Sequence, residues 1–322
     1  MPPHFLVNQP MRITMRAVLR SRLTIAVLLS ALTVASRAQD PPPKPGSAPA
    51  PRDTHEMLNA VLWIQTSAEY RFLCEGIYAS ARDALDRALA DPTWTAALEQ
   101  TKDFSQLPPA VIMDIDMTVL EHSGYQGELV KRGLSPTSRM WREFVGKYSM
   151  PEVPGAIQFI KYARSRGVTV FFVTNRELEL EAGTRRNLIQ LGLDLPESPD
   201  TLMVVGEQPG WTYDKSSRRS YLARSYRILL QCGDDLEDFL VGGGNDPERR
   251  LELAGEHREM WGRRWFFLPN PLTGSWTSVL TRNAGRMNEA QSLDHRRSLV
   301  RGYDAMPLLA PEPAKTKTVE GH

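Results

Sequence analysis

Polar side chains that could act together in catalysis follow several apolar runs of the sequence. Asp114 and Asp116 lie one residue apart where the run AVIM ends. Further along the chain, the corresponding polar residues are Thr174 and Asn175, then Lys215, then Asp234, Asp235 and Asp238 in the segment GDDLEDF. Several carboxylates that share a dry pocket with one lysine would protonate unless another cation compensated their charge. A hard divalent cation with oxygen ligands meets this need, and Mg²⁺ is the usual choice beside few carboxylates and a phosphate.

Short apolar runs that alternate with helix-like stretches are the elements expected to position these side chains. Such an alternation predicts an α/β fold, in which a parallel sheet is covered by helices on both faces. Because ligands bind beyond the carboxyl ends of such strands, we expect the polar groups to meet at one edge of the sheet. The runs are AVIMD (110–114), VTVFFVT (168–174), LMVV (202–205), YRILLQCG (226–233) and RWFFLP (264–269), and the helix-like stretches include 155–166 and 177–191.

Leucine and isoleucine recur at an approximately helical spacing between residues 54 and 90. This pattern predicts one long helix or two, with Asp53 or Thr54 as N-cap and Pro92 as the stop. We expect the folded part to start near Thr54, with a helical segment over 54–105 that forms a small lid.

The first 38 residues have the layout of a secretory signal peptide. Arginines precede LTIAVLLSALTVA, an apolar run that ends in small residues before an expected cut after Ala38. The run is short for a membrane-spanning helix, although an uncleaved anchor is the alternative, and Met1, Met11 and Met15 are all candidate starts. The Pro- and Ala-rich segment 39–53 predicts a disordered linker. We therefore expect an exported protein, periplasmic or extracellular, without a stable membrane anchor.

Charge and cysteine content narrow the classes of partner. Without residues 1–38, Lys+Arg falls from 39 to 34 against 38 Asp+Glu, a net charge of about −4. With this charge and no basic block, nothing indicates binding to a nucleic acid polymer.

Cys74 and Cys232 have neither CxxC spacing nor a histidine at metal-ligand spacing. A disulfide between them is one interpretation, and a buried free thiol is the favoured one because Cys232 lies in an apolar run.

The order DxDxT, T, K and GDxxxD resembles the haloacid dehalogenase (HAD) superfamily. More narrowly, the chain resembles its subfamily IIIB, the class C acid phosphatases, which include bacterial lipoprotein 5′-nucleotidases. This implies a HAD-type phosphatase domain over 54–285 and a C-terminal extension over 286–322, whose tail we expect to be disordered. The segments that carry the resemblance are VLWIQTSAEYR (61–71), MDIDMTVLEHSGYQ (113–126), PGAIQFIKYARSRGVTVFFVTNR (154–176), DKSSRR (214–219), GDDLEDF (233–239) and FLPNPLTGSW (267–276).

Three features depart from the family pattern. Met117 stands where the family commonly has Glu, and NPLTGSW lacks an aromatic residue often found there. No cysteine follows the apolar run of the signal segment, so a lipid anchor is not supported.

The resemblance implies chemistry at phosphorus. Asp114 would attack phosphorus and form an aspartyl-phosphate, which divides one difficult hydrolysis into two easier displacements. Asp116 would protonate the leaving alcohol and then deprotonate the attacking water. Thr174, Asn175 and Lys215 would bind phosphoryl oxygens, and the lysine would also hold the nucleophile in line. Taken singly, the aspartate pair, Thr174 and Lys215 have plainer interpretations as a turn cap, a helix N-cap and a surface lysine.

The resemblance also implies a Mg²⁺ site and its surroundings. Asp238 fits a supporting role, in which it orients a metal-bound water or Lys215, whereas Asp235 either shares that role or caps the helix that follows. The implied ligands are Asp114, the backbone carbonyl of Asp116, and Asp234.

Aromatic residues after the nucleophile are candidates for substrate binding. Tyr125 and Trp141 could stack on a base or ring, although packing of lid helices is the favoured interpretation of both. His122 is close enough in sequence to meet a leaving group, but a solvated loop histidine is the simpler interpretation.

Asp116 also distinguishes among reactions of the superfamily. Dehalogenases attack carbon and have no use for an acid at this position, and transport ATPases carry Thr there. From another class, a storage or binding protein on the same fold is the alternative, as in plant relatives expected to lack the nucleophile. Because Asp114 is present, we expect an exported, Mg²⁺-dependent phosphomonoesterase. Its expected substrate is a small phosphomonoester such as a nucleoside 5′-monophosphate or an aryl phosphate, and the oligomeric state stays open.

Overall fold

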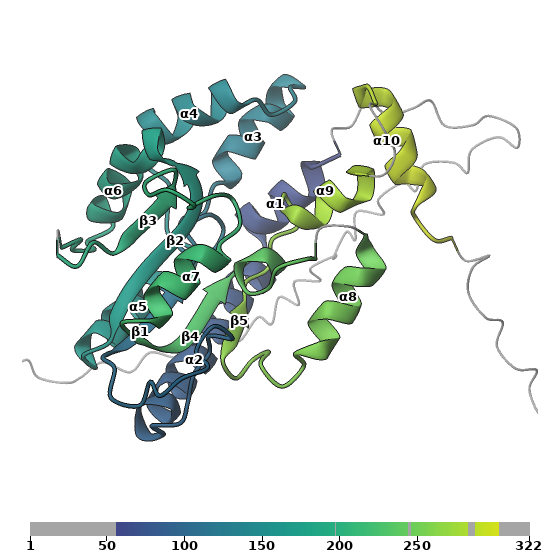
Figure 1. The fold of residues 1–322 in the computed structure, drawn as a ribbon. Helices are drawn as coiled ribbons and strands as arrows, with labels where there is room; N and C mark the ends of the chain where they lie inside the picture. Colours follow the sequence, from purple (N-terminus) through teal and green to yellow (C-terminus); the bar gives the residue numbers. More distant parts are fainter. Residues whose placement is uncertain (1–55, 197, 244–245, 283–286, 303–322) are drawn as a thin grey trace, which may run out of the picture. The chain divides into compact units, whose positions relative to one another are not determined.

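The computed structural model describes residues 56–196, 198–243, 246–282 and 287–302. The predicted signal peptide, the linker and the tail from residue 303 on lie outside the described residues. In the described part, parallel strands form one sheet in the order β3-β2-β1-β4-β5, which confirms the predicted α/β class (Figure 1). The strands are β1 (Pro109–Met113), β2 (Thr169–Glu177), β3 (Leu202–Val205), β4 (Arg227–Gly233) and β5 (Trp265–Phe267).

Helices cover both faces of this sheet because its strands are apolar on both sides. Along β1, Val111 and Met113 face one core cluster, to which the helices α2 and α5 contribute. Ile112, between them, faces a second cluster with Leu222 of α7 and Leu253 of α8. The helices are α1 (Leu58–Thr66), α2 (Ala68–Ala90), α3 (Ser123–Arg132), α4 (Ser138–Lys147), α5 (Ala156–Ser165), α6 (Glu181–Gln190), α7 (Ser216–Ala223), α8 (Pro247–Glu256), α9 (Ser275–Arg282) and α10 (Glu289–Ser298), with short 3₁₀ turns η1 (Leu178–Leu180) and η2 (Leu236–Asp238).

The N-terminal helical segment consists of two helices. They separate at Ser67, whose extended backbone ends α1 and whose side chain accepts a hydrogen bond from the Tyr70 N–H at 3.1 Å. Met57 precedes α1, and the expected caps lie outside the described residues. The second helix ends at Ala90, ahead of Pro92 as predicted, and no helix occurs over residues 91–108. The helical segment is therefore shorter than the expected 54–105. Its second helix, α2, does not form a lid, because it packs on α5 and β4 as part of the core.

Helices α3 and α4 are inserted between two short strand-like segments that follow β1. These segments pair through an antiparallel bridge between Leu120 and Glu152, and the Glu121 N–H donates to the Pro151 carbonyl at 2.9 Å. Beside them, α4 lies against α6, where a Cβ on Gly183 would come within 2.8 Å of the backbone oxygen of Val145. We call residues 123–147 the α3–α4 cap.

The two cysteines, Cys74 on α2 and Cys232 on β4, are buried free thiols, which confirms the favoured interpretation over a disulfide. Burial raises the pKa of the Cys74 thiol to about 12. Neither thiol is therefore a ready nucleophile. Among the described helices, none is long and apolar enough to cross a membrane.

Candidate active site

The carboxyl ends of β1 and β4 bring three aspartates into one cluster. Asp114 follows β1, and its N–H donates to the Cys232 carbonyl of β4 at 2.9 Å, which fixes the two strand ends side by side. Carboxylate oxygens of Asp114, Asp234 and Asp238 all lie within 4.8 Å of one another. The predicted meeting of these groups at one edge of the sheet is thus confirmed for the aspartates.

Lys215, directly ahead of α7, supplies the positive charge in this cluster. Its side chain is 4% exposed, and its ammonium donates to Asp114 and, at 2.6 Å, to Oδ1 of Asp238. Burial lowers the pKa of Lys215, but the two carboxylates outweigh burial and raise it, so the lysine stays charged. Its interpretation as a surface lysine is therefore wrong, since the side chain is buried and contacts Asp114.

The remaining negative charge fits a divalent cation. Burial raises the pKa of Asp114 to about 7, despite Lys215, and burial with two neighbouring carboxylates raises that of Asp234. One ammonium thus does not neutralise the cluster. Hard carboxylate oxygens in this number are the ligands that Mg²⁺ takes in proteins. Asp114 and Asp234 would hold it.

Asp238 is better suited to hold other residues of the site than to bind the cation. Its Oδ1 accepts from Lys215, and its Oδ2 accepts from the N–H groups of Asp234 and Asp235, both at 3.0 Å. Gly233 makes this packing possible, because a Cβ there would lie 2.3 Å from that Oδ2. The predicted supporting role of Asp238 toward Lys215 agrees with these contacts.

Asp234 is held in place by two side chains. The Thr118 hydroxyl donates to its Oδ1 at 3.2 Å, and the Asn270 amide donates to its Oδ2 at 2.7 Å. Thr118, the last member of DxDxT, reaches this position because the chain turns sharply after β1. The left-handed backbone of the buried Met117, with φ 55°, is part of that turn.

Asp235 does not join the carboxylate cluster and instead caps η2, the 3₁₀ turn that follows it. Its carboxylate accepts from the Glu237 N–H at 3.0 Å at the start of η2, and it also accepts from the backbone and hydroxyl of Ser275. Of the two roles left open for it, capping is the one that these contacts support.

Asp116 is held by an arginine that the sequence reasoning missed. The guanidinium of Arg176, at the end of β2, donates from Nε to Oδ2 at 2.9 Å and from Nη2 to Oδ1 at 2.7 Å. Burial raises the pKa of Asp116, but the charge and hydrogen bonds of Arg176 outweigh burial and lower it. The available signal was the position of Arg176, two residues after Thr174 in VTNR.

A second missed arginine, Arg218 on α7, supports the end of β2 that carries Thr174 and Asn175. It is fully buried and donates to the backbone oxygen of Thr174 and, at 2.8 Å, to Oδ1 of Asn175. Thr174 is buried and accepts from the Arg176 N–H at 3.2 Å, whereas Asn175 is exposed. The interpretation of Thr174 as a helix N-cap is wrong, because it lies within β2.

His122, directly ahead of the α3–α4 cap, packs with Tyr125 and Trp141 of the cap. Ring centroids of His122 and Tyr125 lie 5.4 Å and 5.2 Å from that of Trp141, in edge-on geometry. His122 is 5% exposed and faces Gln126 at 2.9 Å, so its interpretation as a solvated loop histidine is wrong. Tyr125 is 6% exposed, which agrees with packing in the cap, and stacking of either ring on a substrate stays a prediction.

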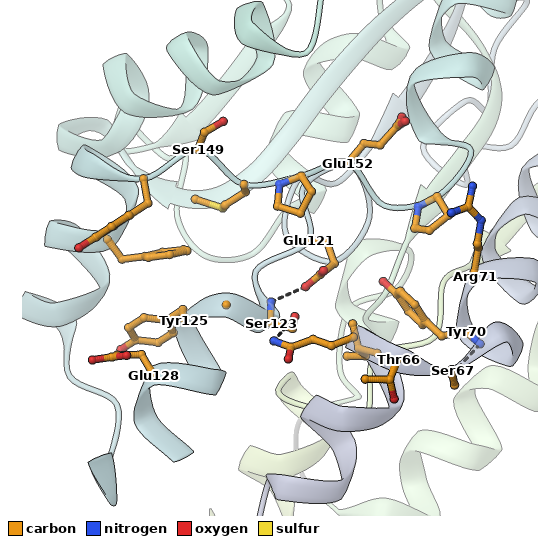
Figure 2. A pocket seen from close by; sticks show the side chains of 18 of the residues that line it. Thr66, Ser67, Tyr70, Arg71, Glu121, Ser123, Tyr125, Glu128, Ser149 and Glu152 are labelled. Carbon is orange, nitrogen blue, oxygen red and sulfur yellow. Dashed lines mark hydrogen bonds between the residues drawn. The ribbon is translucent and has the colours of Figure 1, made fainter. Parts of the chain in front are cut away.

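A groove of about 1030 Å³ lies beside the cap, between α3, α4 and the junction of α1 with α2. Figure 2 shows Tyr125 and Ser123 on one side of it and Tyr70 and Arg71 on the other. None of the candidate catalytic aspartates lines this groove, although Met150 of its lining contacts Arg176.

Comparison with known proteins agrees with this geometry. The family model of the HAD superfamily, subfamily IIIB (acid phosphatase), matches residues 46–276. The class C acid phosphatase from Bacillus anthracis superposes with a TM-score of 0.66 at 27% identity, covering 77% of this chain and 98% of that one. Its tungstate-bound crystal structure gives the same values.

Two plant proteins are also similar in sequence. The Stem 28 kDa glycoprotein of Glycine max is 27% identical over 169 residues, and the Stem 31 kDa glycoprotein of the same plant is 26% identical over 170. Each match covers 50% of this chain, and 58% and 51% of the respective relative, so the chain spans about half the length of these curated relatives. The family model, in contrast, matches well over half of the chain, and the chain therefore belongs to the HAD superfamily, subfamily IIIB, the acid phosphatases.

Proposed function

We propose that this chain is an exported, Mg²⁺-dependent phosphomonoesterase that hydrolyses its substrate through an aspartyl-phosphate on Asp114. The observation that carries the proposal is the buried contact of Asp114 with Lys215. In the same cluster, a carboxylate oxygen of Asp234 lies within 4.8 Å of one of Asp114. A nucleophilic carboxylate, a lysine that stays charged and a site for a divalent cation are the parts that phosphoryl transfer needs. Membership of the acid phosphatase subfamily supports the same reaction.

Each residue of the site has its own role in this reaction. Asp114 attacks phosphorus while Lys215 holds its carboxylate in line and neutralises a phosphoryl oxygen. The Thr174 hydroxyl and Asn175 bind further phosphoryl oxygens, at the end of β2, where Arg218 donates to both residues. Asp116 donates its proton to the leaving alcohol and later accepts one from water.

Asp114 and Asp234, together with the backbone carbonyl of Asp116, would hold a divalent cation. When bound, it would supply positive charge to the phosphoryl oxygens. Thr118 and Asn270 orient Asp234 for this role. Such supporting hydrogen bonds commonly matter as much as a ligand itself.

The substrate class that we favour is nucleoside 5′-monophosphates and aryl phosphates. The α3–α4 cap is short, so the phosphate site accepts bulky leaving groups. Trp141, which is partly exposed, offers a flat surface, and stacking of a base on it contributes about 1 to 3 kcal/mol.

Hydrolysis of a chromogenic phosphomonoester by the purified chain, with and without chelator, tests the reaction. We expect activity that EDTA removes and Mg²⁺ restores, and full activity in metal-free protein would contradict the proposal. Comparing kcat/KM for 5′-AMP, p-nitrophenyl phosphate and glycerol phosphate, with Tyr125→Ala and Trp141→Ala alongside, tests the substrate class. Equal values for all three substrates, unchanged by either variant, would leave a general phosphatase.

A catalytically weak storage or ligand-binding protein on the same fold is the alternative function. The similarity to two stem glycoproteins of Glycine max makes it worth separating. In this chain Asp114 contacts Lys215, and carboxylate oxygens of Asp114 and Asp234 lie within 4.8 Å of each other, which favours the enzyme. A protein that binds phosphate but shows no turnover with any phosphomonoester would instead support storage.

A further inference from the structure

Arg176 is the most completely enclosed charge next to the candidate acid. Its side chain is 1% exposed, whereas that of Asp116, its partner, is 25% exposed. Two parallel N–H donors meet the two oxygens of one carboxylate, at 2.9 Å and 2.7 Å. A fork of this kind fixes both the position and the plane of the carboxylate, which a single hydrogen bond does not.

The other contacts of Arg176 enclose its guanidinium. Its Nη1 donates to the hydroxyl of Thr184 on α6 at 3.0 Å, and its Nη2 lies 3.2 Å from Sδ of Met150. The guanidinium carbon lies 5.5 Å from the ring centre of Trp141 on α4. Because these neighbours enclose it, the guanidinium has no open side toward a phosphoryl group.

We infer that Arg176 is a positioning residue, which holds the carboxyl group of Asp116 so that its open edge faces the leaving-group oxygen. The inference rests on the proposed function, in which Asp116 is the acid. Thr184 and Met150 hold the guanidinium from α6 and from the segment after the cap, so the acid is positioned by three separate parts of the chain.

The step that this arrangement serves is the loss of the leaving group. In the form of the protein whose Asp116 is protonated, an oxygen of Asp114 forms its bond to phosphorus, the bond from phosphorus to the ester oxygen breaks, and the proton of Asp116 passes to that oxygen. The products of the step are an alcohol, the phosphorylated Asp114 and the Asp116 carboxylate. Water then attacks phosphorus and gives its proton to Asp116, which releases phosphate and restores both aspartates.

The need for this proton depends on the leaving group. An alkyl alcohol leaves poorly as an alkoxide, so its release depends on a well-placed acid, which contributes roughly 10²- to 10⁴-fold. Dinitrophenol leaves readily as its anion and needs no proton. Displacing Asp116 should therefore slow alkyl phosphates far more than dinitrophenyl phosphate, whereas general damage to the site should slow both.

The test compares kcat/KM of Arg176→Gln and wild type on glycerol phosphate and on 2,4-dinitrophenyl phosphate. This parameter reports steps up to the first irreversible one, which is the transfer to Asp114. We expect a loss of about 100-fold with glycerol phosphate, the cost of an acid misplaced by about 1 Å, and a loss below about threefold with the dinitrophenyl ester. Arg176→Lys keeps the charge but not the two parallel N–H donors. We expect it to recover about a tenth of the kcat/KM on glycerol phosphate that Arg176→Gln loses. Equal losses on both substrates would overturn the inference.

Two controls separate the inference from the function on which it rests. Asp116→Asn should show the same selectivity for leaving group, and the double variant with Arg176→Gln should lose little more than Asp116→Asn alone. If Asp116→Asn slows both substrates equally, the proposed acid is wrong. If it is selective and Arg176→Gln is not, only the role of Arg176 is wrong.

Matched variants guard against a trivial loss of folding. Arg185→Gln removes a salt-bridged arginine of α6, whose ion-pair partners are Glu181 and Asp200, and it should leave both rates unchanged. If Arg176→Gln does not fold, Thr184→Val removes one hydrogen bond from the same guanidinium. It should show a smaller loss confined to glycerol phosphate, and a loss on both substrates would refute the inference.

Discussion

Replacing the nucleophile by Asn should abolish turnover and yet stabilise the metal-free protein at neutral and higher pH. Burial raises the pKa of Asp114 from 3.8 to about 7 without a metal, although Lys215 opposes the shift. The folded chain therefore binds more protons at this site than the unfolded chain between about pH 4 and pH 7, and stability falls as pH rises through that window. The rise of the pKa from 3.8 to about 7 corresponds to about 4 kcal/mol.

In the Asp114→Asn variant the side chain at position 114 carries no charge at any pH, so the variant does not lose stability as pH rises through this window. Lys215 keeps Asp238 as a partner in the variant, so its own burial stays compensated. In EDTA at pH 8, the free energy of unfolding of Asp114→Asn should therefore exceed that of wild type by up to about 4 kcal/mol. At pH 4 this advantage should vanish. Saturating Mg²⁺ should restore wild type at pH 8, because the cation compensates the carboxylate.

Urea denaturation followed by tryptophan fluorescence, with both proteins at pH 4 and pH 8 in EDTA and in Mg²⁺, measures these differences. Comparing the two proteins at each pH cancels the titration of the other groups that they share. A difference in unfolding free energy that is the same at both pH values would refute the reasoning. So would a kcat of Asp114→Asn above a few per cent of wild type, since an amide does not attack phosphorus.

Three further predictions follow from other contacts of the site. Asp234→Asn should raise the Mg²⁺ concentration needed for half-maximal activity by about 10- to 100-fold, and an unchanged metal titration would remove Asp234 from the metal site. Gly233→Ala should cost about 1 to 3 kcal/mol of unfolding free energy and reduce kcat, because its Cβ would strike the Asp238 carboxylate; denaturation and activity measured on one sample check both effects. Material from the native host should begin at or near Gln39, and N-terminal sequencing that finds Met1 on membrane-bound protein would contradict export.

The strands and the aspartates at their ends could be predicted from the sequence because local patterns specify them. An apolar run such as LMVV becomes a strand buried on both faces, and whatever follows it lies at the carboxyl edge. Asp114 and Asp234 were found by this rule, and Lys215 by its place in the order of motifs. The break between α1 and α2 was harder, because the helical spacing continues across Ser67.

Arg176 and Arg218 could not be predicted as site residues because their roles depend on distant partners. Arg176 pairs with a residue 60 positions earlier, and Arg218 with one 43 positions earlier. In the sequence they are two arginines among 39 lysines and arginines, and most such residues are exposed. The burial of His122 escaped prediction for the same reason, since its cover comes from Trp141 on another helix.

The pairing of β1 with strands on both sides has a consequence for folding. The contact of Asp114 with Lys215 closes a loop of 101 residues, and that of Thr118 with Asp234 closes one of 116. Contacts so distant in sequence form slowly, because the entropy of loop closure is lost before the contacts compensate it. A folding intermediate that has formed its helices but not the pairing of β1 with β4 would have the nucleophile without its lysine or Asp234. Recovery of activity during refolding should therefore follow the last step of sheet assembly, later than the recovery of helical signal.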